Sequence, residues 1–107
     1  MARGPVKPRR YDRVVGPFDA RHADRPEAPL LVYDLSVGGC FVNSMREQPD
    51  GSTFVLKIAL PHEGWITLNA ETLHHLQFGF AVRFLNVDAD TTSRITRTVE
   101  ILKTGRS

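Results

Sequence analysis

Two short clusters carry the side chains best suited to binding a ligand. Residues 9–13 read RRYDR and place Arg9 and Arg13 four positions apart. Residues 34–39 read DLSVGG and combine the Asp34 carboxylate with a hydroxyl and two glycines. A guanidinium clamps phosphate oxygens through its planar fork, which lysine cannot reproduce, and a carboxylate accepts hydrogen bonds from donor edges. These residue types predict the binding of an anionic, polar ligand.

The second cluster is expected at the end of a strand. Asp34 and Ser36 would then point to the same face, because side chains alternate along a strand. Gly39, together with Gly38, permits a positive φ and a close backbone approach that presents N–H groups to a ligand. The cluster therefore predicts a small recognition patch on one surface.

Each of these residues also has a purely structural explanation. Arg9 and Arg10 could belong to a solvated basic tail. Asp34 could pair with Arg13, and residues 36–39 could simply form a turn. The sequence alone leaves these alternatives open.

Catalysis and metal binding find little support. The chain lacks a Gly-x-Ser-x-Gly elbow and the glycine-rich loops that cradle phosphates. His74 and His75 are adjacent and would face opposite sides of a strand, while His22 and His62 fall in expected loops without ligand spacing. The single cysteine, Cys40, excludes an internal disulfide and is expected to be a small buried apolar residue. We therefore expect neither an enzyme nor a metal or cofactor site.

Charge is distributed unevenly along the 107 residues, whose net charge is +2. Residues 1–13 hold five basic residues against one acidic residue, whereas the rest of the chain has nine against eleven. A basic arm favours an anionic partner such as a nucleotide, a nucleic acid or an acidic protein surface. The sequence contains neither a secretory signal nor a membrane-spanning stretch, so we expect a cytoplasmic protein without membrane insertion.

Hydrophobic periodicity predicts mainly β-structure. Period-two alternation is clearest over 54–60, 66–71 and 78–84, and a helical spacing of Ile95, Val99 and Leu102 follows it. Trp65, at the start of one of these strands, is expected to pack. The first half of the chain is predicted to contain a strand over 13–20 interrupted near Gly16 and Pro17, a loop over 21–29, a strand over 30–36, a turn over 37–39, an apolar run over 40–42 and a polar stretch over 44–51. The three alternating strands follow, separated by turns at 61–64 and 74–77. The last element is a helix capped by Asp88 or Asp90 and ended by Gly105. This order predicts a six-stranded antiparallel β-barrel with a C-terminal α-helix.

The two clusters, in this order and with this barrel, resemble the motifs of the PilZ domain family. Arg9 and Arg13 match its Arg-x-x-x-Arg motif, and residues 34–39 match its Asp-x-Ser-x-x-Gly motif. Residues 79–86 resemble its last strand, which a C-terminal helix follows. Residues 1–10 contain Gly4, Pro5 and Pro8 and lack apolar periodicity, which predicts a flexible segment. We therefore expect a flexible basic arm over residues 1–13, which carries the first motif, and a PilZ-like barrel with its helix over residues 14–104.

PilZ domains are bacterial receptors for cyclic di-GMP, so the resemblance implies that ligand. Its implied binding residues are Arg9, Arg10, Arg13, Asp34, Ser36, Gly38 and Gly39. Arginine can bond guanine O6 and N7 as well as phosphate, and Asp34 suits the guanine N1–H and N2–H₂ edge. The family often carries another arginine where this chain has Pro8, which leaves open whether one or two ligand molecules bind.

The resemblance also implies how such a receptor would signal. The arm would be mobile without ligand, would order over the barrel when ligand binds, and would present a new surface to an unidentified effector protein in motility, biofilm or polysaccharide control. Two alternatives remain: a ligand-free protein-interaction module on the same barrel, and a barrel that binds nucleic acid through its arm. The strands lack the basic, aromatic-rich face that stacks bases, which disfavours nucleic acid.

Overall fold

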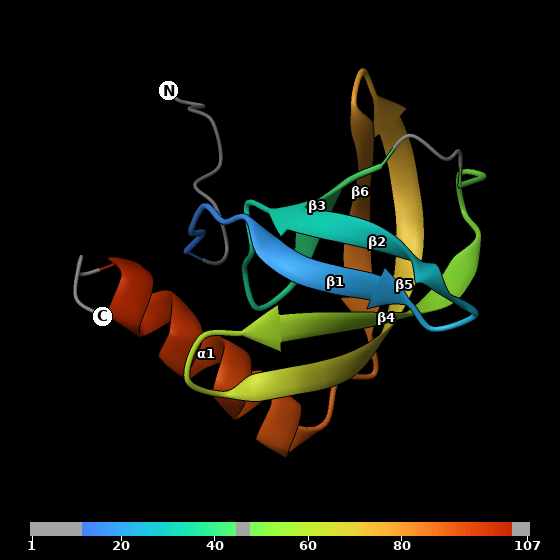
Figure 1. The fold of residues 1–107 in the computed structure, drawn as a ribbon. Coiled ribbons are helices and arrows are strands. Elements are labelled where there is room, and N and C mark those ends of the chain that lie inside the picture. The colour runs from blue at the N-terminus through green and yellow to red at the C-terminus, as the bar shows by residue number, and fades with distance from the viewer. Residues whose placement is uncertain (1–11, 45–47, 104–107) are drawn as a thin grey trace, which may run out of the picture.

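The computed structural model describes residues 12–44 and 48–103. Six strands form a closed, wholly antiparallel barrel in the order β1-β2-β3-β6-β5-β4 (Figure 1). The elements are β1 (Phe18–His22), β2 (Arg25–Tyr33), β3 (Gly39–Asn43), β4 (Thr53–Leu60), β5 (Gly64–Leu76), β6 (Gly79–Leu85) and α1 (Ala89–Lys103). The predicted fold class is confirmed. The predictions made for Gly105 and for most of the arm lie outside the described residues.

The alternating segments line the barrel interior as predicted. In β4, the side chains of Phe54, Leu56, Ile58 and Leu60 are buried while the intervening residues are not. Because successive side chains of a strand point to opposite faces, this pattern directs one face of β4 into the core.

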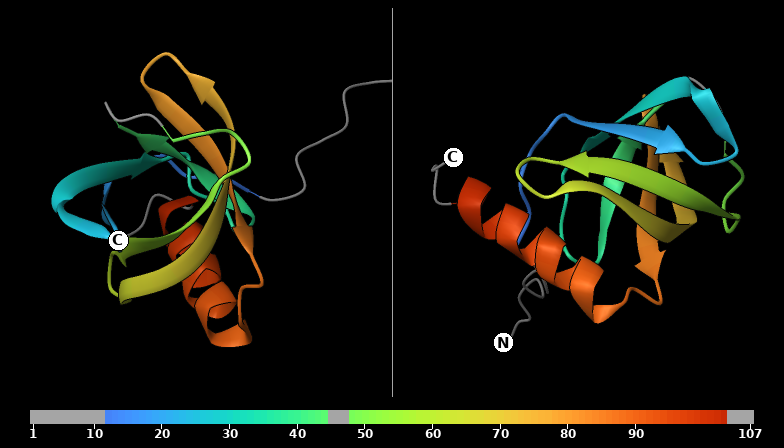
Figure 2. Two further views of the ribbon diagram at one scale, coloured as in Figure 1. Left: turned by 90° about the vertical axis from the view of Figure 1, so that its right-hand side faces the viewer. Right: turned by 60° about the horizontal axis from the view of Figure 1, so that its bottom comes forward.

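The helix α1 lies against one end of the barrel, beside the turn between β4 and β5 (Figures 1 and 2). Its buried face includes Ile95 and Val99. The Asp88 carboxylate accepts a 2.7 Å hydrogen bond from the Thr91 N–H, and this bond lowers the pKa of Asp88. Asp88, rather than Asp90, is therefore the N-cap, since a side-chain oxygen satisfies a free N–H of the first turn.

The helix is tied to the β4–β5 turn by charge. Arg97 donates two hydrogen bonds of 2.9 Å to the Glu63 carboxylate, and Arg94 donates to the backbone oxygens of Glu63 and Trp65. The bonds from Arg97 lower the pKa of Glu63. Within the described residues, no helix has the length and apolar character needed to cross a membrane.

The first third of the chain differs from the prediction. The stretch 21–29, expected to be a loop, forms most of a hairpin in which β1 ends at His22 and β2 begins at Arg25. Its polar residues and prolines hide the alternation, whereas backbone pairing such as Ala20 with Leu30 defines the strands. The first strand is correspondingly shorter than predicted and begins only at Phe18, after a cis Gly16–Pro17 bond.

The hairpin of β5 and β6 also departs from the prediction. β5 continues to Leu76, through most of the expected turn at 74–77, and its pairing with β6 is irregular between Thr72 and His74. Such a bulge changes which residues face outward. Phe78, expected on the buried face, is 63% exposed, and Trp65, expected to pack, is 50% exposed.

Candidate functional site

The segment between β2 and β3 is held in shape by its own hydrogen bonds. Leu35 is fully buried and exchanges two backbone hydrogen bonds with Val14, of 2.8 and 2.9 Å. The Ser36 hydroxyl donates to the Gly39 carbonyl and accepts from the Gly38 N–H, at 3.2 and 3.3 Å. These bonds fix the loop independently of any ligand.

Two details of this loop correct the sequence-based prediction. Asp34 and Ser36 do not share a strand face, because β2 ends at Tyr33 and Asp34 adopts a φ of 56°. Ser36 is buried, whereas Asp34 is partly exposed. Neither Gly38 nor Gly39 has a positive φ. Gly39 is instead required by packing, because a Cβ there would lie 2.3 Å from the Val82 carbonyl oxygen.

Arg13 and Asp34, 21 positions apart in sequence, meet in an ion pair. The Arg13 Nη1 donates to the Asp34 Oδ2 at 2.8 Å, and the two side chains are 40% and 42% exposed. The bridge between Val14 and Leu35 brings them together, since each residue lies next to one member of the pair. The structural pairing left open by the sequence is therefore present.

A single open groove of about 470 Å³ gathers the predicted residues that the structure describes. It lies over the β2–β3 connection, β3 and the β5–β6 hairpin. Five of the seven predicted residues line it: Arg13, Asp34, Ser36, Gly38 and Gly39. Arg9 and Arg10 lie outside the described residues.

Sequence reasoning missed the opposite wall of this groove. Leu73, His74, Leu76 and Arg83 line it, and the two leucines are 45% and 56% exposed. Arg83 donates to the Glu71 carboxylate. No local motif marks these residues, because their place depends on how β5 pairs with β6 beyond the bulge. The one signal that could have identified this wall is the exposure of Leu73 and Leu76 on the same hairpin, which the sequence pattern did not predict.

The groove combines features that suit a phosphorylated purine. Arg13 and Arg83 supply cations, Asp34 supplies an acceptor, and the two leucines offer an apolar surface against which a flat ring can pack. A volume of several hundred Å³ is in the range of small-molecule sites.

Cys40 borders the groove but is buried, as predicted. Burial raises the pKa of its thiol far above the ordinary value, and the negative charge of Asp34 adds to the effect. Since the thiolate is the reactive form of cysteine, burial disfavours reaction at this thiol. Across residues 12–44 and 48–103, no cluster of three His, Cys, Asp or Glu side chains could hold a metal ion.

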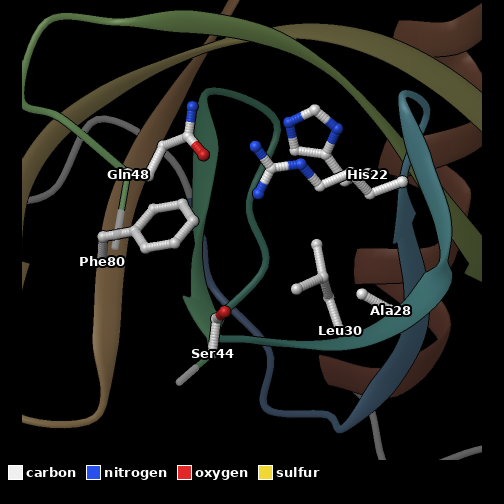
Figure 3. Close-up of a pocket in the computed structure, with 7 residues that line it drawn as sticks. His22, Ala28, Leu30, Ser44, Gln48 and Phe80 are labelled. Atoms are coloured by element: carbon white, nitrogen blue, oxygen red, sulfur yellow. The ribbon is translucent and has the colours of Figure 1, made fainter. Parts of the chain in front are cut away.

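A second hollow, shown in Figure 3, opens at the barrel end where β1 finishes and β2 begins. His22, Leu30 and Phe80 are among its lining residues. Its volume of about 20 Å³ is close to that of one water molecule. It is therefore too small for an organic ligand.

The sequence matches the PilZ domain family model over residues 7–100, and the chain belongs to this family. PilZ domains are receptor and adaptor modules, which agrees with the expectation of a binding protein rather than an enzyme. No curated protein sequence matches the chain.

Solved structures share the fold at low sequence identity. YcgR of Escherichia coli in complex with c-di-GMP is 24% identical, with a TM-score of 0.77, over 94% of this chain and 48% of its own. The inhibitor of motility MotI of Bacillus subtilis is 18% identical, with a TM-score of 0.79, over 94% and 54%. The PilZ domain of YcgR with c-di-GMP is 20% identical, with a TM-score of 0.73, over 92% and 94%. The chain thus spans about half the length of the first two.

Proposed function

We propose that this chain is a cyclic di-GMP receptor whose ligand occupies the groove between the β2–β3 connection and the β5–β6 hairpin. The observation that carries the proposal is that all five of the predicted binding residues that the structure describes line this one groove. Family membership supports the ligand class, as do the similar YcgR structures, which were solved with c-di-GMP.

Arg13 and Asp34 are assigned the direct contacts. Arg13 would bond a phosphate or the O6 and N7 atoms of guanine, and Asp34 would accept from the guanine N1–H and N2–H₂ donors. Because the two side chains are paired with each other and partly exposed, ligand binding must open or share this pair. An exposed pair contributes only about 0–1 kcal/mol, so several charge-assisted bonds to the ligand can replace it.

Ser36 and the two glycines are assigned a positioning role. The Ser36 hydroxyl is buried and already bonded within the loop, so it shapes the backbone beside the ligand. The apolar surfaces of Leu73 and Leu76 would pack against a purine face.

The N-terminal arm is proposed to transmit ligand binding to an effector protein. Residues 1–13 are proposed to act as a basic arm beside a barrel and helix over 14–104, with Arg9 and Arg10 adding positive charge near the ligand. At the base of this arm, the Asp12 carboxylate accepts a 2.6 Å hydrogen bond from Lys103 at the end of α1, and this pairing raises the pKa of Lys103. A change in the arm would therefore alter the contact with α1 and present a new surface to an effector protein in the cytoplasm, in trans. The similarity to MotI, an inhibitor of motility, makes motility a candidate process.

The Arg13–Asp34 pair also favours a second candidate, a PilZ module that binds protein partners without a nucleotide. In that case, the pair would serve only to hold the start of the barrel against the β2–β3 connection. Calorimetric titration distinguishes the two candidates.

The experiment titrates cyclic di-GMP into the full chain and into its Arg13→Ala and Asp34→Ala variants. Arg21→Ala and Asp90→Ala remove matched charges outside the groove and serve as controls. We expect binding by the parent and both controls, and at least about tenfold weaker binding by the two groove variants, since a charge-assisted bond contributes about 1.5–3 kcal/mol. Cyclic di-AMP should bind more weakly, because adenine lacks the donor pair assigned to Asp34.

If titration of cyclic di-GMP into the parent chain gives no heat of binding, the ligand-free module is favoured. Binding that both groove substitutions leave unchanged would refute the site. Amide hydrogen exchange over residues 1–13 tests the arm: cyclic di-GMP should slow exchange in the parent chain but not in Asp34→Ala. Equal exchange with and without saturating ligand would reject the role of the arm.

A further inference from the structure

A third hollow, of about 320 Å³, lies on the outer face of the barrel, over β1, β4 and β5. Two cations and an indole dominate its lining. The residues around it are Arg21, Ala23, Pro26, Lys57, Trp65 and Thr67.

The strand register brings these side chains together. Arg21 of β1 is paired with Lys57 of β4, and Lys57 is paired in turn with Thr67 of β5. Trp65 lies two positions before Thr67 on the same face of β5, since side chains alternate along a strand. The Cζ atom of Arg21 lies 6.0 Å from the centre of the Trp65 ring, within the range of a cation–π contact.

The two cations in this hollow are not neutralised. Within the described residues, neither Arg21 nor Lys57 forms an ion pair, and Arg21 donates only to the neighbouring Ala20 carbonyl oxygen. By contrast, Arg13 and Arg97 each contact a carboxylate. The indole of Trp65 is half exposed although it is large and apolar. This patch is therefore complementary to a group that brings both negative charge and an apolar surface.

We propose that this hollow docks an acidic peptide segment of a protein partner, in which a carboxylate side chain is close to an apolar or aromatic one. The carboxylate would pair with Arg21 and Lys57, and the apolar side chain would pack on Trp65. Tryptophan and arginine are the residue types most enriched among the contacts that dominate protein–protein binding. The partner is therefore a protein that presents an acidic segment of this kind.

Single-stranded nucleic acid fits the hollow less well. Its phosphates are held by a track of cations along successive nucleotides, and its bases stack on open aromatic faces. Here only two cations line the hollow, and Trp65 is the one aromatic residue among its lining residues, so the hollow lacks a track for successive nucleotides.

The hollow and the groove use different parts of the barrel surface and have no lining residue in common. Both include residues of β5, but Trp65 and Thr67 lie near the start of this strand, whereas Leu73 and Leu76 lie near its end. The inference therefore does not depend on the proposed ligand.

Trp65 is the only tryptophan in the chain, so its fluorescence and its indole N–H signal in NMR spectra report on this hollow alone. The probes are short synthetic peptides that place Glu one to three residues from Phe or Leu. Control peptides carry Gln in place of Glu, and oligothymidylate serves as the nucleic-acid probe. The proteins are the full chain, Lys57→Gln and Arg21→Gln, with Arg83→Gln as the control in the groove.

We expect acidic peptides to shift the Trp65 signals, and the Gln peptides to fail. Affinity should fall about tenfold in Lys57→Gln and Arg21→Gln but not in Arg83→Gln, because each of the first two substitutions removes a charge-assisted bond to the peptide carboxylate. The proposal is overturned if no acidic peptide shifts the indole signals, if the Gln peptides bind equally well, or if oligothymidylate binds more tightly. Arg13→Ala should retain the peptide response, so failure of the messenger site and failure of this site are separable.

Discussion

Replacing Gly39 with alanine tests whether this motif glycine serves the fold or the ligand. Gly39 pairs with Arg83 at the first position of the β3–β6 ladder. A Cβ at this position would be 2.3 Å from the Val82 carbonyl oxygen, about 1 Å short of the roughly 3.3 Å at which carbon and oxygen atoms touch. The obstacle is backbone rather than a flexible side chain, so β6 itself must move.

The size of the effect follows from this displacement. If β6 moves about 1 Å away from β3, the 2.9 Å hydrogen bond from the Phe84 N–H to the Gly38 carbonyl breaks, because hydrogen bonds weaken steeply beyond about 3.5 Å. Each lost bond costs about 0.5–1.5 kcal/mol, and overpacking costs about 1–3 kcal/mol. We expect Gly39→Ala to lower the free energy of unfolding by about 2–4 kcal/mol, a large part of the stability of a small domain.

Urea unfolding followed by circular dichroism measures this loss. Gly51→Ala is the matched control, because Gly51 has a φ of 80° and open space around its Cβ position. That variant should lose only about 1 kcal/mol through left-handed backbone strain. If Gly39→Ala unfolds at the same urea concentration as Gly51→Ala or a higher one, the packing argument is wrong. A stable Gly39→Ala that no longer binds cyclic di-GMP would assign the glycine to the ligand instead.

Two further substitutions test the core and the attachment of the helix. Thr72 is buried and, within the described residues, its Oγ1 has no hydrogen-bond partner. Thr72→Val removes this unsatisfied polar group at nearly constant volume, so it should raise the free energy of unfolding by up to about 1 kcal/mol. A lower free energy of unfolding, measured with urea, would contradict this. Glu63 has a pKa lowered from 4.5 by its bonds to Arg97, so its stabilising effect is present above pH 4.5 and is lost as pH falls through the lowered value. Glu63→Gln should therefore lower the Tm by a few degrees at pH 7 and by progressively less as the pH falls through the lowered pKa of Glu63, with Glu100→Gln as the exposed control. A Tm difference that stays constant as the carboxylate becomes protonated would refute the role of the ion pair.

The sequence determined those strands and the helix in which buried side chains recur at a regular spacing. Alternation over 54–60 predicted a strand within one residue of β4, and the spacing of Ile95 and Val99 predicted the packed face of α1. These patterns are local, because a strand or helix with one buried face repeats apolar residues at its own period. The order of such elements then restricted the fold to an antiparallel barrel with a helix.

The sequence also identified one side of the candidate site. The residue types of the two motifs, and hence the recognition of the PilZ family, are visible without coordinates. The hairpin at 21–29 was missed, since its prolines and polar residues conceal strand pairing that only the backbone shows.

Tertiary structure alone decided how the motif residues meet and what faces them. An isolated bridge outside the barrel strands pairs Val14 with Leu35 and so places Arg13 against Asp34. The bulge in β5 turns Leu73 toward the groove, and the register of three strands gathers Trp65, Lys57 and Arg21 around the outer hollow, where neither cation forms an ion pair with a described residue. Register, bulges and closure depend on partners far apart in the chain, and the local spacing of residues does not encode them.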